Sequence, residues 1–234
     1  MTLTPLDQFE GSLAERTYLS LRQAILDLTY RPGAPMPKRD ICQELGVSRS
    51  PVSEAIAQLA ADGLVRVVPQ AGTYVALFSM AEIREGAFLR EAIEVAAVEL
   101  LAPQIEDDQL RLLRRNLRLQ EVMVAEGDGL GFYDLDSQFH GTLLAQTGFR
   151  KLRSVSETAW VHVDRARQQM LPVEGRLEET LKEHQRIYDA MASRDPLAAR
   201  VAMRDHLRQL VKFLEPLERS RPELFAREQE GASP

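Results

Sequence analysis

The first part of the chain has apolar residues at helical spacing. Over residues 12–28 they fall three and four positions apart, which predicts an amphipathic helix. Shorter helices are predicted over 38–45, closed by the left-handed residue Gly46, and over 49–62, where Ser48 is the candidate N-cap. The predicted order is therefore a helix followed by a helix, a tight turn and a further helix.

A different pattern follows the third predicted helix. Residues 64–68 and 73–77 are rich in β-branched and aromatic side chains, and they flank a Pro-Gln-Ala-Gly turn at 69–72. Two such segments separated by a turn predict a β-hairpin. A helix-turn-helix with a hairpin directly behind it has the order of a winged helix-turn-helix.

The rest of the chain returns to helical spacing, interrupted by proline and glycine. The predicted helices lie at about 79–101, 107–126, 129–147, 149–171, 174–193 and 195–217. We therefore predict a mainly α protein, with a winged helix-turn-helix domain at 12–77 and an all-helical antiparallel bundle of about six helices at 79–217. The polar tail from 219 to 234 is predicted to be frayed.

Composition narrows the possible functions. The net charge of −6 argues against a protein that coats nucleic acid by bulk electrostatics, yet residues 12–76 carry seven basic and six acidic side chains, so any DNA binding is local. The single cysteine, Cys42, cannot form an internal disulfide and is expected to be a small core residue. No signal pattern or long apolar stretch is present, which predicts a cytoplasmic protein without a membrane partner.

The second and third predicted helices supply what a helix-turn-helix needs to contact DNA. Side chains at the start of the recognition helix reach base edges in the major groove, and Arg49 is the best candidate for bidentate contact with guanine. Arg39 and Ser48 are placed to contact the backbone. The full set of candidate DNA contacts, wing included, is Arg39, Ser48, Arg49, Ser50, Ser53, Gln70 and Gly72. A Gly-Val-Ser turn between two amphipathic helices also occurs in proteins that bind no DNA, and the hairpin favours the DNA interpretation.

A longer set of residues resembles a known family. It consists of Leu45-Gly46-Val47-Ser48-Arg49-Ser50-Pro51-Val52, Glu54-Ala55-Ile56, Leu59, Asp62-Gly63-Leu64-Val65 and Gly72-Thr73-Tyr74-Val75. Over about 12–77 the chain resembles GntR-family transcriptional regulators. The resemblance implies a homodimer that binds inverted-repeat, double-stranded operator DNA. Ser53 stands where the family usually has arginine, and Gln70 where it usually has the wing-tip glycine, so operator sequence and wing contacts are not carried over.

All four histidines lie in the predicted bundle. Asp136 and His140 are four residues apart on one helix, so both side chains project from the same face and can hold one ion. His184 and His206 occur within apolar helical patterns and are expected to point into the bundle. Taken singly, each of these histidines is more easily explained as a hydrogen-bonded core residue. Taken together, they suggest a shared metal site.

A second resemblance helps to decide whether these histidines are core residues or metal ligands. The motifs are Arg90-x-x-x-Glu94, Asp136-x-x-Phe139-His140, Glu183-His184-x-x-Ile187 and Asp205-His206-Leu207. Over about 79–215 they resemble the FCD ligand-binding domain of the FadR subfamily of GntR regulators. The resemblance implies that Asp136, His140, His184 and His206 bind a divalent metal ion, and that the metal and Arg90 together bind a small carboxylate effector.

The metal and the remaining effector contacts are predicted less narrowly. Histidine and carboxylate ligands suit zinc best, while nickel, manganese and iron are alternatives. His162 is placed equally well in the pocket or in the core, and Arg165 and Arg167 are both within sequence reach of a carboxylate.

Three functions are compatible with these patterns. The first is a ligand-responsive regulator, expected to be a repressor, whose effector changes its affinity for DNA. The second is a regulator with a purely structural or metal-sensing site. The third is a metal-dependent enzyme that activates water or oxygen at the same ligands, for which the sequence offers no evident general acid or base. Because the enzyme hypothesis leaves the N-terminal half without a role, we expect a regulator and not an enzyme.

Overall fold

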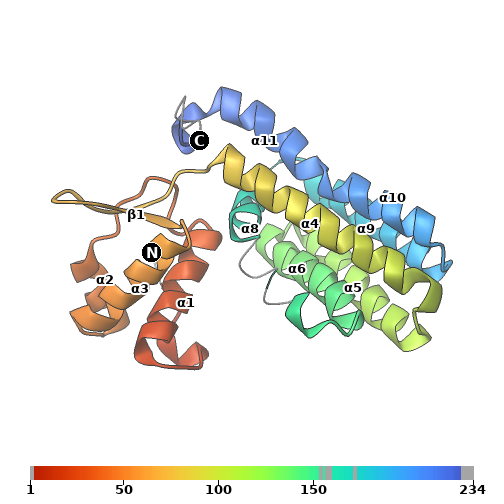
Figure 1. Cartoon of the computed structure of the whole chain (residues 1–234), viewed down its shortest axis with the longest axis horizontal. Coiled ribbons are helices and arrows are strands. Elements are labelled where there is room, and N and C mark those ends of the chain that lie inside the picture. Colours follow the sequence, from red (N-terminus) through yellow and green to blue (C-terminus); the bar gives the residue numbers. More distant parts are fainter. Residues whose placement is uncertain (1–2, 153–154, 156–159, 171–172, 228–234) are drawn as a thin grey trace. The chain divides into compact units, whose positions relative to one another are not determined.

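The computed structural model in Figure 1 describes residues 3–152, 155, 160–170 and 173–227. It divides into two compact units. Unit 1 takes the chain up to Met80 and again from Glu218 onward, and unit 2 takes Ala81–Leu217. The predicted mainly helical fold, with one small hairpin, is confirmed.

Unit 1 contains the predicted helices. They are η1 (Leu6–Gln8), α1 (Leu13–Leu26), α2 (Lys38–Leu45) and α3 (Arg49–Ala61). The helix α1 begins with a capping box in which Ser12 and Glu15 satisfy each other's backbone N–H groups. Gly46 ends α2 at φ 66°, where a side chain would add strain. The apolar faces of these helices meet in a core that includes Leu21, Ile41 and Leu59.

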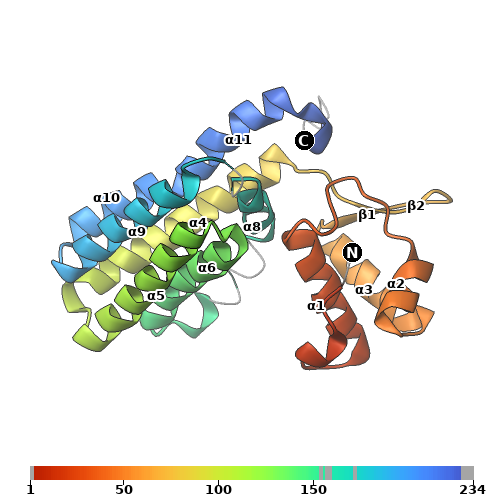
Figure 2. The ribbon, with the colours of Figure 1, turned by 180° about the vertical axis from the view of Figure 1, so that it is seen from behind.

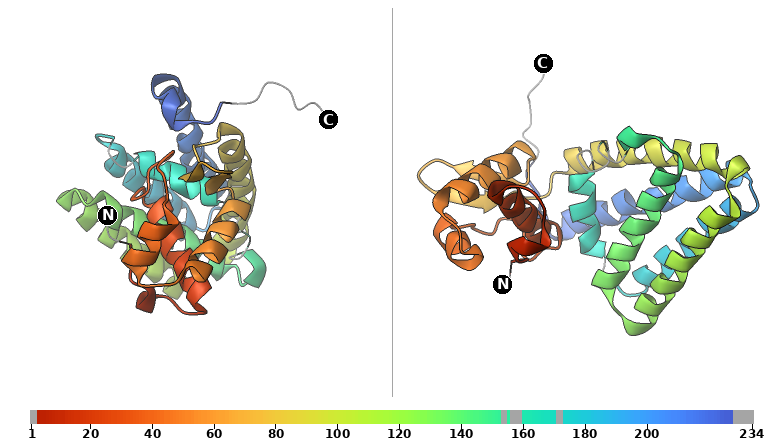
Figure 3. Two further views of the ribbon diagram at one scale, coloured as in Figure 1. Left: turned by 90° about the vertical axis from the view of Figure 1, so that its left-hand side faces the viewer. Right: turned by 90° about the horizontal axis from the view of Figure 1, so that it is seen from below.

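The wing is a two-stranded antiparallel sheet behind α3. Strands β1 (Val65–Val68) and β2 (Gly72–Val75) pair in a register that runs from Val65 opposite Val75 to Val68 opposite Gly72. Gln70, in the turn, has φ 61°, a left-handed conformation that is unusual for a residue other than glycine. Figure 3 gives two further views of this hairpin and of the helices of unit 1.

The described part of the tail, residues 219–227, contributes to unit 1, contrary to the prediction that it is frayed, and residues 228–234 lie outside the described residues. Helix η4 (Pro222–Leu224) leads into Phe225, which is only 4% exposed. The backbone of Phe78 pairs with this segment on both sides, because its N–H donates to the Leu224 carbonyl at 2.9 Å and its carbonyl accepts from Ala226 N–H at 2.7 Å. The rings of Phe78 and Phe225 lie 5.6 Å apart between centroids. The prediction rested on the polar composition of the tail and did not include the burial of Phe225.

Unit 2 is a helical bundle. Its main elements are α4 (Met80–Leu101), η2 (Ala102–Gln104), α5 (Asp107–Glu126), α6 (Gly129–Gln146), α8 (Val161–Arg167), η3 (Gln168–Met170), α9 (Arg176–Ala192), α10 (Pro196–Leu207) and α11 (Gln209–Ser220). Helix α5 packs against α6 and α9, and α9 packs in turn against α10. Figure 2 shows these helices running alongside α4 from the opposite side. Their shared core includes Val98, Leu117, Phe139, Ile187 and Met203.

Two of the predicted helices differ from what is observed. The prediction of one helix over 195–217 is wrong, because the helix breaks at Arg208 into α10 and α11. At the break, the Arg208 guanidinium donates to both carboxylate oxygens of Glu91 on α4, at 2.7 and 2.8 Å. Of the helix predicted over 149–171, α8 is present, whereas residues 153–154, 156–159 and 171 lie outside the described residues. No helix in the described part of the chain has the length and apolar content needed to cross a bilayer.

Candidate functional site

Four buried side chains from three helices converge inside unit 2. Asp136 and His140 lie one turn apart on α6, His184 comes from α9 and His206 from α10. One ligand atom from each of the four lies within 4.8 Å of all the others. Residues up to seventy positions apart in the sequence thus meet at one point.

The histidines face one another through the same ring atom. Nε2 of His140 lies 3.1 Å from Nε2 of His206, and Nε2 of His184 lies 3.4 Å from Oδ1 of Asp136. The other ring nitrogen of each histidine, Nδ1, points outward to a fixed acceptor. These acceptors are a carboxylate oxygen of Glu94 for His140, the amide oxygen of Gln120 for His184 at 2.8 Å, and a carboxylate oxygen of Glu183 for His206 at 2.7 Å.

This arrangement fixes the tautomer of each ring. A carboxylate or amide oxygen only accepts hydrogen bonds, so each Nδ1 carries the proton and each Nε2 presents a lone pair to the centre. The Gln120 side chain is itself held in this orientation, because its Nε2 donates to Asn116 Oδ1 at 2.7 Å and Asn116 donates to the Leu135 carbonyl at 2.9 Å. Outer partners of this kind orient metal-binding histidines.

The electrostatics keep the rings neutral and the surrounding carboxylate charged. Burial and the neighbouring imidazoles hold the pKa of His184 and of His206 well below the usual histidine value. Burial also lowers the pKa of His140, against an opposing effect of Glu94. Burial raises the pKa of Glu94, but the effects of Arg90 and His140 lower it by more. The pKa is therefore below the usual value, and the carboxyl is ionised. Neutral imidazole is the form that binds metals.

These residues fit a divalent metal ion. Three lone pairs directed at one point repel one another unless a cation lies between them, and Nε2 of His184 is buried without a hydrogen-bond partner. Asp136 adds a charged oxygen ligand. Three imidazole nitrogens and one carboxylate form a donor set that suits zinc, and also nickel, manganese or iron.

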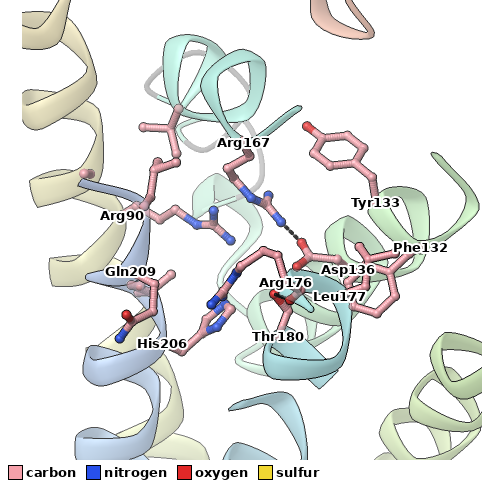
Figure 4. Close-up of a pocket in the computed structure, with 14 residues that line it drawn as sticks. Arg90, Phe132, Tyr133, Asp136, Arg167, Arg176, Leu177, Thr180, His206 and Gln209 are labelled. Carbon is pink, nitrogen blue, oxygen red and sulfur yellow. Dashed lines mark hydrogen bonds and ion pairs between the residues drawn. The ribbon is translucent and has the colours of Figure 1, made fainter. Parts of the chain in front are cut away.

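A cavity of about 60 Å³ opens beside this cluster. Its lining includes Asp136 and His206 together with three arginines from three helices, namely Arg90 of α4, Arg167 of α8 and Arg176 of α9. Figure 4 shows these side chains directed toward the same space, with Arg167 paired to the Asp136 carboxylate. Basic side chains from three helices therefore share the cavity wall with two of the candidate metal ligands.

The predicted effector residues lie in different places. Arg90 lines the cavity, whereas neither His162 nor Arg165 is part of its lining. His162 lies on α8 with Nδ1 3.5 Å from a carboxylate oxygen of Glu82, and Arg165 is fully buried. Arg167, considered from the sequence alongside Arg165, does line it.

Two residues of the site were missed from the sequence. Arg176 and Gln120 were not among the candidate residues taken from the sequence. The only sequence signal for Gln120 was its spacing of four from Asn116, which puts both side chains on one face of α5.

The predicted DNA contacts form a separate, solvent-facing group in unit 1. Arg39, Ser48, Arg49 and Ser50 are exposed, and so are Gln70 and Gly72 at the wing tip. The hydroxyl of Ser48 makes no capping hydrogen bond to α3. Ser53 is half-buried and accepts a hydrogen bond from Lys38 Nζ at 3.3 Å, which the sequence did not predict.

Comparison with family models identifies both units. Residues 13–75 match the gntR family of bacterial regulatory proteins, and residues 85–209, more than half of the chain, match the FCD domain. The chain belongs to the GntR family. The resemblance inferred from its motifs is thereby confirmed, and the family consists of transcriptional regulators and not of enzymes.

Relatives of known sequence support the assignment over nearly the whole chain. A transcriptional regulator from an unstable DNA locus of Streptomyces ambofaciens is 34% identical, and the match covers 89% of this chain and 88% of the relative. The transcriptional repressor RspR of Escherichia coli is 31% identical, with 92% and 94% covered. Both are described as helix-turn-helix regulators, as expected for a GntR-family protein.

Solved structures agree with the fold. A GntR transcriptional regulator from a Rhodococcus species matches with a TM-score of 0.77 and 28% identity, over 88% of this chain and 99% of that one. McbR of Escherichia coli matches with a TM-score of 0.76 at 19% identity, over 89% and 99%. At that identity the second match supports the fold alone.

Proposed function

We propose that this GntR-family protein is a homodimeric transcriptional repressor whose affinity for operator DNA is set by a small carboxylate effector, bound at a divalent metal ion in unit 2. One observation carries the proposal: three histidine Nε2 atoms and Asp136 meet at the wall of an arginine-lined cavity. A structural metal site needs no adjoining cavity, and a core histidine cluster needs no common direction for its lone pairs.

The metal would be held by Asp136, His140, His184 and His206, with zinc as the first candidate and nickel, manganese or iron as alternatives. When bound, the ion supplies an open coordination position for a carboxylate oxygen of the effector. Arg90 lies at the cavity wall and is paired with Glu94 at 2.6 Å, and this pair would hold the guanidinium in place for the effector's carboxylate. The chain's own residues therefore contribute both ion binding and anion binding.

Unit 1 would contact the DNA. Arg49 is exposed at the first position of α3, where a recognition helix contacts bases. Its chain neighbours Ser48 and Ser50 are also exposed, as is Arg39 near the start of α2. Two copies of α3 are needed for an inverted repeat, which is why we propose a homodimer. Repression, and not activation, is proposed because RspR, similar over nearly the whole chain, is described as a repressor.

The test is fluorescence anisotropy on the DNA upstream of the protein's own gene, with zinc-loaded full-length protein and a panel of small carboxylic acids. We expect one acid to change operator affinity, and we expect the change to disappear in His184→Ala together with bound zinc. His162→Ala, which removes a histidine outside the cluster, is the matched control and should keep its zinc. If zinc binds but no acid alters DNA affinity, the site is structural or senses the metal itself, and the proposed effector role is wrong.

A further inference from the structure

Positively charged side chains outnumber negatively charged ones among the residues that line the cavity. Three arginines line it, namely Arg90, Arg167 and Arg176, and Asp136 is the only carboxylate among its lining residues. A divalent ion at the cluster would add two further positive charges. An electropositive, largely buried site of this kind favours a ligand with more than one negative charge.

The partners of these arginines lie mostly behind the cavity wall. Arg90 pairs with Glu94 at 2.6 Å, and Arg176 forms a bidentate pair with Glu183 at 2.7 and 3.0 Å. Both carboxylates also accept a hydrogen bond from a histidine of the cluster. Each of these arginines is therefore balanced by its own carboxylate, and nothing in these pairs offsets the charge of an added metal ion.

The remaining arginine shares its carboxylate with the candidate metal. Arg167 pairs with Asp136, and its other terminal nitrogen lies 3.4 Å from the partly exposed carboxylate of Asp164. An ion bound by Asp136 competes with Arg167 for that carboxylate. Arg167 then keeps only its longer, 3.4 Å hydrogen bond to Asp164, and its other terminal nitrogen can pair with another anion. Arg176 also has a donor to spare, because its Nε is buried without a hydrogen-bond partner.

The apolar part of the wall and the size of the cavity limit the carbon skeleton of a ligand with two negative charges. Leucine, valine and phenylalanine side chains line it between the polar groups, and they suit a short carbon chain. The volume is about 60 Å³, and a water-sized group needs roughly 10–15 Å³, so this cavity suits a compact molecule. Two of its arginines, Arg90 and Arg167, also line a second cavity.

We infer that the effector is a compact dianion, a short-chain dicarboxylate with one carboxylate toward the metal ion and Arg90 and the other toward Arg167 and Arg176. This rests on the proposed function, since it assumes that the cavity takes an acid at all. The two arginines of α8 and α9 then determine specificity, by distinguishing a diacid from a monoacid of the same length.

The experiment is isothermal titration of zinc-loaded, full-length protein with two matched pairs, malonate against propionate and succinate against butyrate. Zinc content is measured after each titration, so that chelation by the diacid is not mistaken for binding. We expect a diacid to bind at least about tenfold more tightly than its matched monoacid, which corresponds to about 1.4 kcal/mol. We expect the preference to disappear in Arg176→Gln and to persist in Arg200→Gln, which alters an exposed arginine of α10.

The outcomes separate the two proposals. If diacid and monoacid bind equally, the dianion inference is overturned while a carboxylate-binding site stands. If no acid binds to protein that retains zinc, the proposed function fails as well.

Because Arg176 holds Glu183 and through it His206, Arg176→Gln can lose zinc. Arg167→Gln then takes its place, and a preference that survives this change with zinc bound places the second carboxylate elsewhere.

Discussion

Nε2 of His140 and Nε2 of His206 face each other at 3.1 Å, although 66 residues separate them in the chain. Two neutral imidazoles in this tautomer cannot hydrogen-bond to each other, because both nitrogens present lone pairs. The contact is maintained by Glu94 behind one ring and Glu183 behind the other. The outer carboxylates therefore help to fix the geometry of the candidate metal ligands.

Removing the outer partner of the third histidine should weaken the site without removing a ligand. We expect Gln120→Ala to lower zinc affinity about 10- to 100-fold, because His184 loses the acceptor that fixes its tautomer. Competition with a chromogenic chelator measures the change. Gln120→Glu restores an acceptor and should retain most of the affinity. Gln104→Ala, at an exposed glutamine, is the control, and an affinity loss equal to that of Gln120→Ala would contradict the role given to Gln120.

If Arg49 contacts operator bases, its removal should reduce affinity for operator DNA more than affinity for unrelated DNA. Arg49→Ala should reduce affinity for the operator by about ten- to a hundredfold, while affinity for unrelated DNA changes much less. Anisotropy titrations on both DNAs at one salt concentration give the comparison. Arg200→Ala, in unit 2, should leave both affinities unchanged. A parallel loss on operator and unrelated DNA would assign Arg49 to the phosphate backbone.

The stability of unit 1 should fall at alkaline pH. Burial, and then the hydrogen bond to Asp62, raise the pKa of Tyr18 to about 12 from the ordinary value of 10.0. A raised pKa in the folded state means that the stabilisation is complete below about pH 10 and is lost as the pH rises through about 12. Urea unfolding at pH 9 and pH 11 should therefore show a smaller drop for Tyr18→Phe than for the unaltered protein. An equal drop in both would mean that Tyr18 is not responsible.

The contact between Phe78 and the segment around Phe225 should stabilise unit 1 locally. We expect Phe225→Ala to cost about 3 kcal/mol, since the ring is buried, and to speed amide exchange in α1, α3 and the hairpin. Hydrogen exchange followed by mass spectrometry resolves these segments. Leu130→Ala, at a leucine that is 60% exposed, should change exchange little. Unchanged protection in unit 1 would show that the tail adds nothing to it.

Sequence periodicity predicted most of the fold because the signals were local. The helices α5 and α6 and the hairpin depend on residues that are close in sequence, such as the glycine turns between them. The shared helix face of the candidate ligands Asp136 and His140 was predictable for the same reason, since it follows from a spacing of four. The break at Arg208 was not, because it coincides with an ion pair to Glu91, more than one hundred residues away.

The outer parts of the candidate site were hidden for a related reason. Arginines are usually solvated, so nothing local marks Arg176 as a residue that points inward from the start of α9. Its position becomes evident only once Glu183, two turns later, is seen to hold both His206 and the guanidinium. Electrostatic neighbours across helices cannot be inferred from the spacing on one helix.

The pairing of Phe78 with the segment around Phe225 makes the N-terminal unit discontinuous in the chain. During synthesis, this unit lacks its last strand-like partner until the ribosome has made Ala226, after all of unit 2. The same holds for chimaeras within the family: a graft that exchanges only the first eighty residues leaves Phe78 opposite a foreign tail. A functional exchange must carry both segments together.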